Sequence, residues 1–343
     1  MNPNYKLVGL VLIALIIGVA VGWYAKPTLA PVRQERVVLA LDWIFVGQHA
    51  PFFVALDKGY YFDEGLSVEI VRGFGSADTV KRVEAKAVTF GYGDYNTIVL
   101  ERAQGGKVKA VGAVFSKGPW TVFYRADRGI STPKDLEGKT IVGAGPGDVD
   151  IVLLPAFCKE AGVDFSKINV VSADWGSLFP MMMAGKSDGA VEFIVHKPLV
   201  DQQAATVGVT INSFLYADYG LKMYSNGLVA HEDTIKANPD MVRGFVQATM
   251  KGLKYTFEHP DEAVAILQKY HPEVDTAVGL GEIQYMRGLV IVPEIQQHGY
   301  GSMSEDQWTY TRDKVLQMNN LTAQIPVSDL YTNEFIDPSI IPA

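Results

Sequence analysis

Short apolar segments alternate with helix-like segments over the first half of the chain, and this alternation limits the chain to few folds. Residues 37–41 form an apolar run and residues 66–71 alternate strictly between apolar and polar side chains, both typical of strands. Between them, residues 50–58 suit a helix, and Gly59 is placed to end it. Strands that alternate with helices predict an α/β architecture with a mostly parallel sheet.

A second unit of the same kind begins near Ile130. Its strands are predicted at residues 140–143, 168–171 and 189–193, and a helix at residues 149–161. Beyond Tyr219 the pattern changes to four predicted helices, at residues 239–258, 260–270, 275–286 and 304–318. The chain has 343 residues and is 48% hydrophobic, which is enough for two lobes that each have a core.

The N-terminal segment contains nineteen residues without a charge, from Leu7 to Ala25. A helix needs about 20 such residues to cross the hydrocarbon layer of a membrane. A cleaved secretory signal is the alternative, but Pro31 follows the best cleavage site at residues 28–30 and would hinder cleavage. We therefore expect residues 1–25 to be a transmembrane anchor or signal segment and residues 26–36 a tether. Either form places the rest of the chain outside the cytoplasm.

Composition excludes several functions. The formal net charge of −8 argues against a general affinity for nucleic acid, because few cations are available to neutralise phosphates. The single cysteine, Cys158, excludes an intramolecular disulfide, a cysteine-cluster metal site and a lipid anchor next to the apolar segment. No Gly-x-Ser-x-Gly or His-Glu-x-x-His motif occurs, and Gly185-Lys186-Ser187 fails as a phosphate loop because Pro180 occupies the required glycine position. We expect no catalysis, no cofactor and no metal.

Five turns with glycine, serine or aromatic residues follow predicted strands and precede predicted helices. In open α/β sheets, ligands bind beyond the carboxyl ends of the strands, where helix N-termini offer N–H groups. Five such turns over two lobes predict a shared cleft, in which aromatic rings such as Trp43, Tyr92 and Trp175 can sandwich a planar ligand. The turns are Asp42-Trp43 with Gln48-His49, Gly73-Phe74-Gly75-Ser76, Tyr92-Gly93-Asp94-Tyr95, Gly145-Pro146-Gly147-Asp148 and Asp174-Trp175-Gly176-Ser177.

Three segments of the chain are characteristic: Asp42-Trp43 with His49, Lys58-Gly59-Tyr60-Tyr61-Phe62 and Lys134-Asp135-Leu136-Glu137-Gly138-Lys139. In these segments the chain resembles the solute-binding proteins of ABC importers for thiamine precursors and for sulfonate, nitrate and taurine. The resemblance covers nearly all of residues 37–320. It implies a two-lobed type II periplasmic-binding fold with a central cleft. The chain would cross twice between the lobes, near residues 124–127 and 215–224. The first lobe would comprise residues 37–124 and 225–343, and the second residues 125–224.

The resemblance is greatest to the branch that carries pyrimidine precursors of thiamine, so we expect a small planar heteroaromatic ligand. An aliphatic sulfonate, nitrate or another small anion, held at Ser76 and Ser177, is the alternative. A pyrimidine-synthase-like enzyme that uses His49 with Glu192, and a sensor ectodomain, are further alternatives. The expected partners are an ABC permease and its ATPase, the membrane through the N-terminal segment, and no nucleic acid; the chain would act as a monomer. The candidate ligand-binding residues are Trp43, His49, Ser76, Tyr92, Asp94, Gly147, Trp175, Glu192 and Tyr224.

Overall fold

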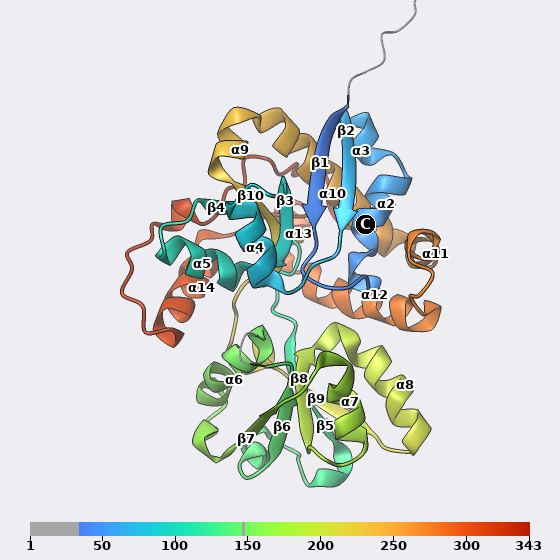
Figure 1. Cartoon of the computed structure of the whole chain (residues 1–343), viewed down its shortest axis with the longest axis vertical. Helices are drawn as coiled ribbons and strands as arrows, with labels where there is room; N and C mark the ends of the chain where they lie inside the picture. Colours follow the sequence, from blue (N-terminus) through green and yellow to red (C-terminus); the bar gives the residue numbers. More distant parts are fainter. Residues whose placement is uncertain (1–33, 146–147) are drawn as a thin grey trace, which may run out of the picture. The chain divides into compact units, whose positions relative to one another are not determined.

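The structure, a computed structural model, describes residues 34–145 and 148–343 (Figure 1). Its strands form two five-stranded sheets. The first has the order β2 (Leu66–Val71), β1 (Glu35–Ala40), β3 (Phe90–Asp94), β10 (Asn226–His231) and β4 (Val108–Ala113). The second has the order β7 (Asn169–Ser172), β6 (Thr140–Gly143), β8 (Gly189–Phe193), β5 (Trp120–Arg125) and β9 (Ile211–Leu215). The predicted α/β class is confirmed.

Each sheet is mixed, but four of its five strands run in the same direction, which agrees with the expectation of a mostly parallel sheet. β1 lies parallel to β2 and β3, and β6 lies parallel to β7 and β8. By contrast, β10 and β5 run antiparallel to both of their neighbours. These two are the first strands after the chain passes from one sheet to the other. No crossover helix on the same sheet precedes them, so nothing forces them into the parallel direction.

The chain passes between the sheets twice, as the resemblance implies. It leaves the first sheet after Ala113 and enters the second at Trp120, and it returns between Leu215 and Asn226. The second passage coincides with residues 215–224. The first lies before the expected position at residues 124–127, because the apolar segment from Trp120 to Arg125 is a strand of the second sheet and is buried over five of its six residues.

Helices cover the sheets and form most of the C-terminal region (Figure 1). The helices between strands of the first sheet are α2 (Ala50–Asp57), α3 (Tyr60–Asp63), α4 (Ser76–Glu84) and α5 (Tyr95–Ala103). Those between strands of the second sheet are α6 (Val149–Glu160), α7 (Trp175–Met183) and α8 (Lys197–Val207). The C-terminal helices are α9 (Glu232–Ala237), α10 (Pro239–Glu258), α11 (Pro260–Tyr270), α12 (Thr276–Val290), α13 (Pro293–His298) and α14 (Glu305–Met318). Two 3-10 turns matter for the site, η1 (Gly47–His49) and η5 (Ile194–His196).

Helix α10 illustrates how the local sequence sets an element and its packing. Asn238 caps it by accepting a hydrogen bond from the Met241 N–H at 3.1 Å, and Pro239 takes the first helical position. The Phe245 ring then stacks on Phe90 of β3, with ring centroids 4.0 Å apart. The helix is thereby fastened to the centre of the first sheet.

The predicted N-terminal anchor, residues 1–25, lies outside the described residues, as does nearly all of the tether. Glu35 and Arg36, the last two tether residues, already belong to β1. Within residues 34–145 and 148–343, every helix is too short or too polar to cross a bilayer.

Candidate functional site

A cavity of about 470 Å³ lies beyond the carboxyl ends of strands from both sheets. This volume is within the range of about 300–1,000 Å³ that small-molecule sites occupy. From the first sheet's side it is lined by Asp42, Trp43, Gln48, Phe74, Gly75, Ser76, Ala77 and Thr97. From the second sheet's side it is lined by Ala144, Gly145, Asp148, Val149, Asp150, Trp175, Glu192, Phe193 and His196.

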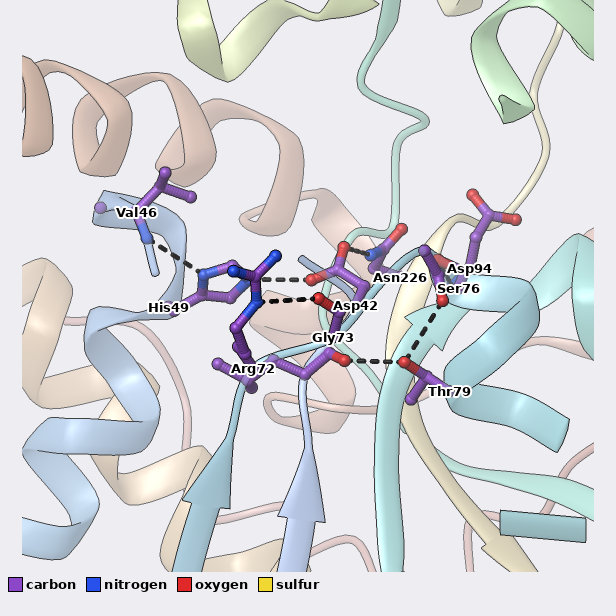
Figure 2. A network of polar contacts seen from close by, with 12 residues as sticks. Asp42, Val46, His49, Arg72, Gly73, Ser76, Thr79, Asp94 and Asn226 are labelled. Atoms are coloured by element: carbon purple, nitrogen blue, oxygen red, sulfur yellow. Dashed lines mark hydrogen bonds and ion pairs between the residues drawn. The ribbon is translucent and has the colours of Figure 1, made fainter. Parts of the chain in front are cut away.

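We call the lining residues from the first sheet's side the first side of the cavity, and those from the second sheet's side the second side. Asp42 belongs to the first side, and both of its carboxylate oxygens have hydrogen-bond partners (Figure 2). Oδ1 lies 2.8 Å from Nε2 of His49, and Oδ2 accepts a hydrogen bond of 2.6 Å from the Asn226 amide. Nδ1 of His49 accepts from the Val46 N–H at 3.3 Å. Since Nδ1 is an acceptor, the ring proton is on Nε2 and is donated to Asp42.

The Asp42-Trp43 turn is also held through its backbone. The Gly73 N–H donates to the Trp43 carbonyl at 3.0 Å, and the Gly75 N–H donates to the Asp42 carbonyl at 2.7 Å. A Cβ at Gly73 would come within 2.0 Å of the Leu41 carbonyl oxygen, so this approach requires glycine.

The polar network continues from Asn226 to Asp94. The Ser225 hydroxyl oxygen is 2.8 Å from Oδ2 of Asp94 and 3.0 Å from Oδ1 of Asn226. Because a hydroxyl has one hydrogen, both contacts are bonds only if Asp94 is protonated and donates to Ser225. Burial raises the pKa of Asp94 to about 7, although the Asn96 N–H and Ser225 favour its charged form. A neutral Asp94 that donates to Ser225 completes the network, in which both oxygens of Asp42 already have partners.

Two tryptophans face the cavity from opposite sides. Trp43 follows β1 and Trp175 begins α7, and their ring centroids are 6.3 Å apart with the planes at 64°. Nε1 of Trp175 donates to Oε2 of Glu192 at 2.6 Å. Nε1 of Trp43 is buried and has no hydrogen-bond partner among the described residues. The two rings thus form an edge-on pair in the lining of the cavity.

Acidic side chains crowd the second side. Burial raises the pKa of Glu192, the charge of His196 opposes this, and the charge of Asp148 adds to it. Burial also raises the pKa of Asp148. For Asp150, burial and the charges of Asp148 and Glu192 hold the pKa well above its usual range. Oδ1 of Asp150 has no hydrogen-bond partner in the described part of the chain. Burial thus favours the protonated forms of these three carboxyl groups, whose titrations are coupled.

His196 connects this side to α12. Its Nδ1 is 3.0 Å from Oε1 of Glu282, and Oε2 of Glu282 accepts a 2.5 Å hydrogen bond from the Gly47 N–H. Burial alone would lower the pKa of His196, but the bond to Glu282 and the charges of Glu192 and Glu282 raise it above its ordinary value. A protonated His196 is therefore balanced by two buried carboxyl groups.

The predicted residues fall into three groups. Trp43, Ser76, Trp175 and Glu192 line the cavity, and Gly147 lies outside the described residues. His49, Tyr92, Asp94 and Tyr224 are buried and are absent from the lining. His49 and Asp94 lie in the polar network behind the lining, and Tyr92 packs against the His49 ring with centroids 5.8 Å apart. The Tyr224 hydroxyl accepts from the Ser304 N–H at 2.8 Å.

Several lining residues were missed by the sequence analysis. Asp148 ends the predicted turn at residues 145–148, and Asp150 is in the first turn of the helix predicted at residues 149–161. Two acidic residues at the start of a predicted helix could have indicated their place in the site. His196 and Glu282 carried no such signal, since they are 86 positions apart and meet only in the fold. Among the described residues, no cluster of three or more His, Cys, Asp or Glu side chains is placed to hold a metal ion.

Comparison with known sequences gives a family and several relatives. The family described as NMT1/THI5 like matches residues 46–263. The riboflavin-binding protein RibY of Chloroflexus aurantiacus is 29% identical, covering 91% of this chain and 90% of its own. A formylaminopyrimidine-binding protein of Halalkalibacterium halodurans is 27% identical over 68% of this chain and 70% of its own. A 4-amino-5-hydroxymethyl-2-methylpyrimidine phosphate synthase of Legionella pneumophila is 24% identical over 71% and 76%.

Comparison with solved structures confirms the predicted type II periplasmic-binding fold. The periplasmic aliphatic sulphonate binding protein SsuA from Escherichia coli matches with a TM-score of 0.67 at 13% identity, over 88% of this chain and 99% of its own. The periplasmic nitrate-binding protein NrtA from Synechocystis PCC 6803 matches with a TM-score of 0.62 at 12% identity, over 88% and 87%. At these identities the likeness concerns the fold alone.

Proposed function

The chain belongs to the NMT1/THI5-like family, and on that premise we propose that it is the extracytoplasmic solute-binding component of an ABC importer. Its solute is a small planar heteroaromatic molecule with amino or ring N–H donors, such as a pyrimidine precursor of thiamine or a related heterocycle. The cavity holds the solute, and an ABC permease with its ATPase receives it. The N-terminal segment keeps the protein at the outer face of the membrane.

The observation that carries this proposal is the Trp175–Glu192 pair opposite Trp43. The indole N–H of Trp175 orients one oxygen of Glu192, whose other oxygen accepts from the Phe193 N–H at 2.9 Å. A planar ring that enters beside Trp175 meets an aromatic face and an oriented carboxyl group at its edge. An aromatic ring with an exocyclic amino group complements both features.

The anion alternative finds less support in the lining. Ser76 lines the cavity, but Ser177, the second serine expected to hold an anion, does not. The described lining contains four carboxyl groups, those of Asp42, Asp148, Asp150 and Glu192, and no lysine or arginine. A sulfonate or nitrate would enter this cavity against several carboxyl groups, and His196, the one basic side chain among the described lining residues, is already paired with Glu192 and Glu282.

The enzyme alternative invoked His49 and Glu192 as an acid–base pair. Both ring nitrogens of His49 are engaged, by Asp42 and by the Val46 N–H, and both oxygens of Glu192 are bonded to Trp175 and to the Phe193 N–H. Neither side chain bonds to the other, which favours binding over catalysis. A chromatographic test for consumption of the bound heterocycle separates the two functions, since a binding protein returns its ligand unchanged.

A ligand panel tests the proposal. The purified full-length chain is titrated with riboflavin, formylaminopyrimidine, an aliphatic sulfonate and nitrate while tryptophan fluorescence and the melting temperature are followed. We expect saturable quenching and a raised melting temperature with at least one of the two heteroaromatic compounds. Saturable binding of the sulfonate or nitrate alone would contradict the proposed ligand class.

Substitution of Trp43 by alanine tests whether the ligand binds in the cavity. Loss of an aromatic pair beyond buried area costs about 0.5–1.5 kcal/mol, so the dissociation constant should rise roughly 2- to 12-fold. Phe62→Ala is the matched control, because this ring on α3 is 66% exposed and is absent from the cavity lining. The control should bind like the unmodified chain.

A further inference from the structure

We infer that the cavity selects the uncharged or cationic form of its ligand and rejects the phosphorylated form, and that Asp148 and Asp150 set this selectivity. The inference rests on the proposed function, because it concerns the ligand held in the same cavity. It names the ligand class more narrowly: a heteroaromatic compound whose polar substituent is a hydroxyl or amino donor, in place of a phosphate ester or another anionic group.

The N-terminus of α6 is the first observation. A helix start that points into a cavity usually offers free N–H groups to an anion. Here Oδ1 of Asp148 accepts the N–H of Asp150 at 3.2 Å, and Oδ2 accepts the N–H of Ala144 at 3.0 Å. The protein's own carboxyl group therefore uses donors that a ligand phosphate would need.

Unpaired acceptors are the second and independent observation. Oε1 of Gln48 in η1 is buried without a hydrogen-bond partner among the described residues, and the residue is 2% exposed and lines the cavity. Oδ1 of Asp150, in a residue that is also 2% exposed, has no partner either, but this carboxyl can donate or accept according to its protonation. The amide oxygen of Gln48 can only accept, so a donor from the ligand would satisfy it. Hydroxyl and amino groups supply such donors, whereas a phosphate dianion supplies none.

The charges around the cavity also disfavour a ligand phosphate. Among the described lining residues, His196 is the one basic side chain, and it lies between Glu192 and Glu282. Arg72 is absent from the lining: its Nε donates to the Gly73 carbonyl, and its guanidinium carbon is 4.6 Å from the centre of the ring of Phe74, a lining residue. A ligand phosphate inside the cavity would thus face four carboxyl groups, while the one basic lining side chain, His196, is already paired with two of the buried acids around it.

Two matched ligand pairs test the inference by calorimetry on the full-length chain. One pair is riboflavin and riboflavin 5′-phosphate, and the other is 4-amino-5-hydroxymethyl-2-methylpyrimidine and its phosphate ester. We expect the free alcohol of at least one pair to bind at least tenfold more tightly than its phosphate. The ratio should shrink in Asp150→Asn, which removes one acid and keeps the side chain's size.

Asp63→Asn is the charge-matched control, because Asp63 is exposed on α3 and is absent from the lining. It should leave the ratio unchanged. Equal or tighter binding of the phosphate esters to the unmodified chain overturns the inference while the proposed function stands. If no member of either pair binds, the proposed function fails and the inference fails with it.

Discussion

The two sides of the cavity handle buried acidic groups in opposite ways. On the first side, each carboxylate oxygen of Asp42 has a donor, from His49 or from Asn226. On the second side, Asp148, Asp150 and Glu192 crowd together and one oxygen of Asp150 has no partner within the described residues. A fully satisfied network holds a fixed shape, whereas an incompletely satisfied one is completed by something else. We therefore propose that the first side holds the lining residues in position and that the second side contacts the ligand.

Asp42→Ala tests the first half of this comparison and should have the largest effect. Removing one partner leaves His49 and Asn226 buried without their acceptor, which should lower the free energy of unfolding by about 3–5 kcal/mol. Urea denaturation measures the change. A loss below about 1 kcal/mol would show that the network contributes little to the fold.

The protonation of Asp94 should make the stability of the fold depend on pH. Its pKa rises from 3.8 to about 7 on folding, so the native state binds the proton more tightly than the unfolded state. The resulting stability is fully present below pH 3.8 and is lost as the pH rises through 7, by up to about 4 kcal/mol. Asp94→Asn keeps an acceptor for Asn96 and a donor for Ser225, so its stability should fall less between pH 4 and 8. Parallel slopes for the two proteins would contradict the protonated Asp94.

Asp150→Asn tests the second side, where the substitution, unlike Asp42→Ala, should stabilise the chain. The folded-state pKa of Asp150 lies above its ordinary value because of burial and the charges of Asp148 and Glu192, so ionisation at high pH works against the fold. The amide should stabilise the chain by about 1 kcal/mol at pH 8, and the gain should shrink toward pH 4. Thermal denaturation at both pH values measures it, with Asp63→Asn as the control. A destabilised variant at pH 8 would contradict the recognition role.

Trp175→Phe should have the smallest effect. The phenyl ring keeps the aromatic face but loses the N–H that orients Glu192. Net loss of one such hydrogen bond is about 1 kcal/mol, so ligand should bind about fivefold more weakly while stability changes little. Fluorescence titration and urea denaturation separate these two quantities. An unchanged affinity would mean that Glu192 needs no orientation from Trp175.

Much of the fold could be predicted because its signals are local. Prolines and capping residues placed α10 and α11 at the residues where the structure has them, and strict alternation placed β2. The strands β5 and β10 were missed, because each follows a passage between the sheets and no helix of its own sheet precedes it. The strand β9, which follows α8, was missed as well. Strand-end turns located the cavity for the same local reason.

The division of roles within the site could not be predicted from sequence. Tyr92 and Asp94 stand on a strand whose five residues are all buried, so they support the lining from behind. Trp43 and Trp175 do line the cavity, but their edge-on angle depends on how the two sides meet. The contact between His196 and Glu282 likewise joins elements that the sequence keeps far apart.

The central claim is that a planar heteroaromatic solute occupies the cavity beside Trp43 and Trp175 and bonds to Glu192. A crystal structure of the chain with the compound that gives saturable binding in the ligand panel tests this most directly. We predict the ring in van der Waals contact with at least one of the two indoles and one of its N–H donors within about 3.2 Å of a Glu192 oxygen. A ligand bound outside this cavity, or held in it without a contact to Glu192 or either tryptophan, would contradict the claim.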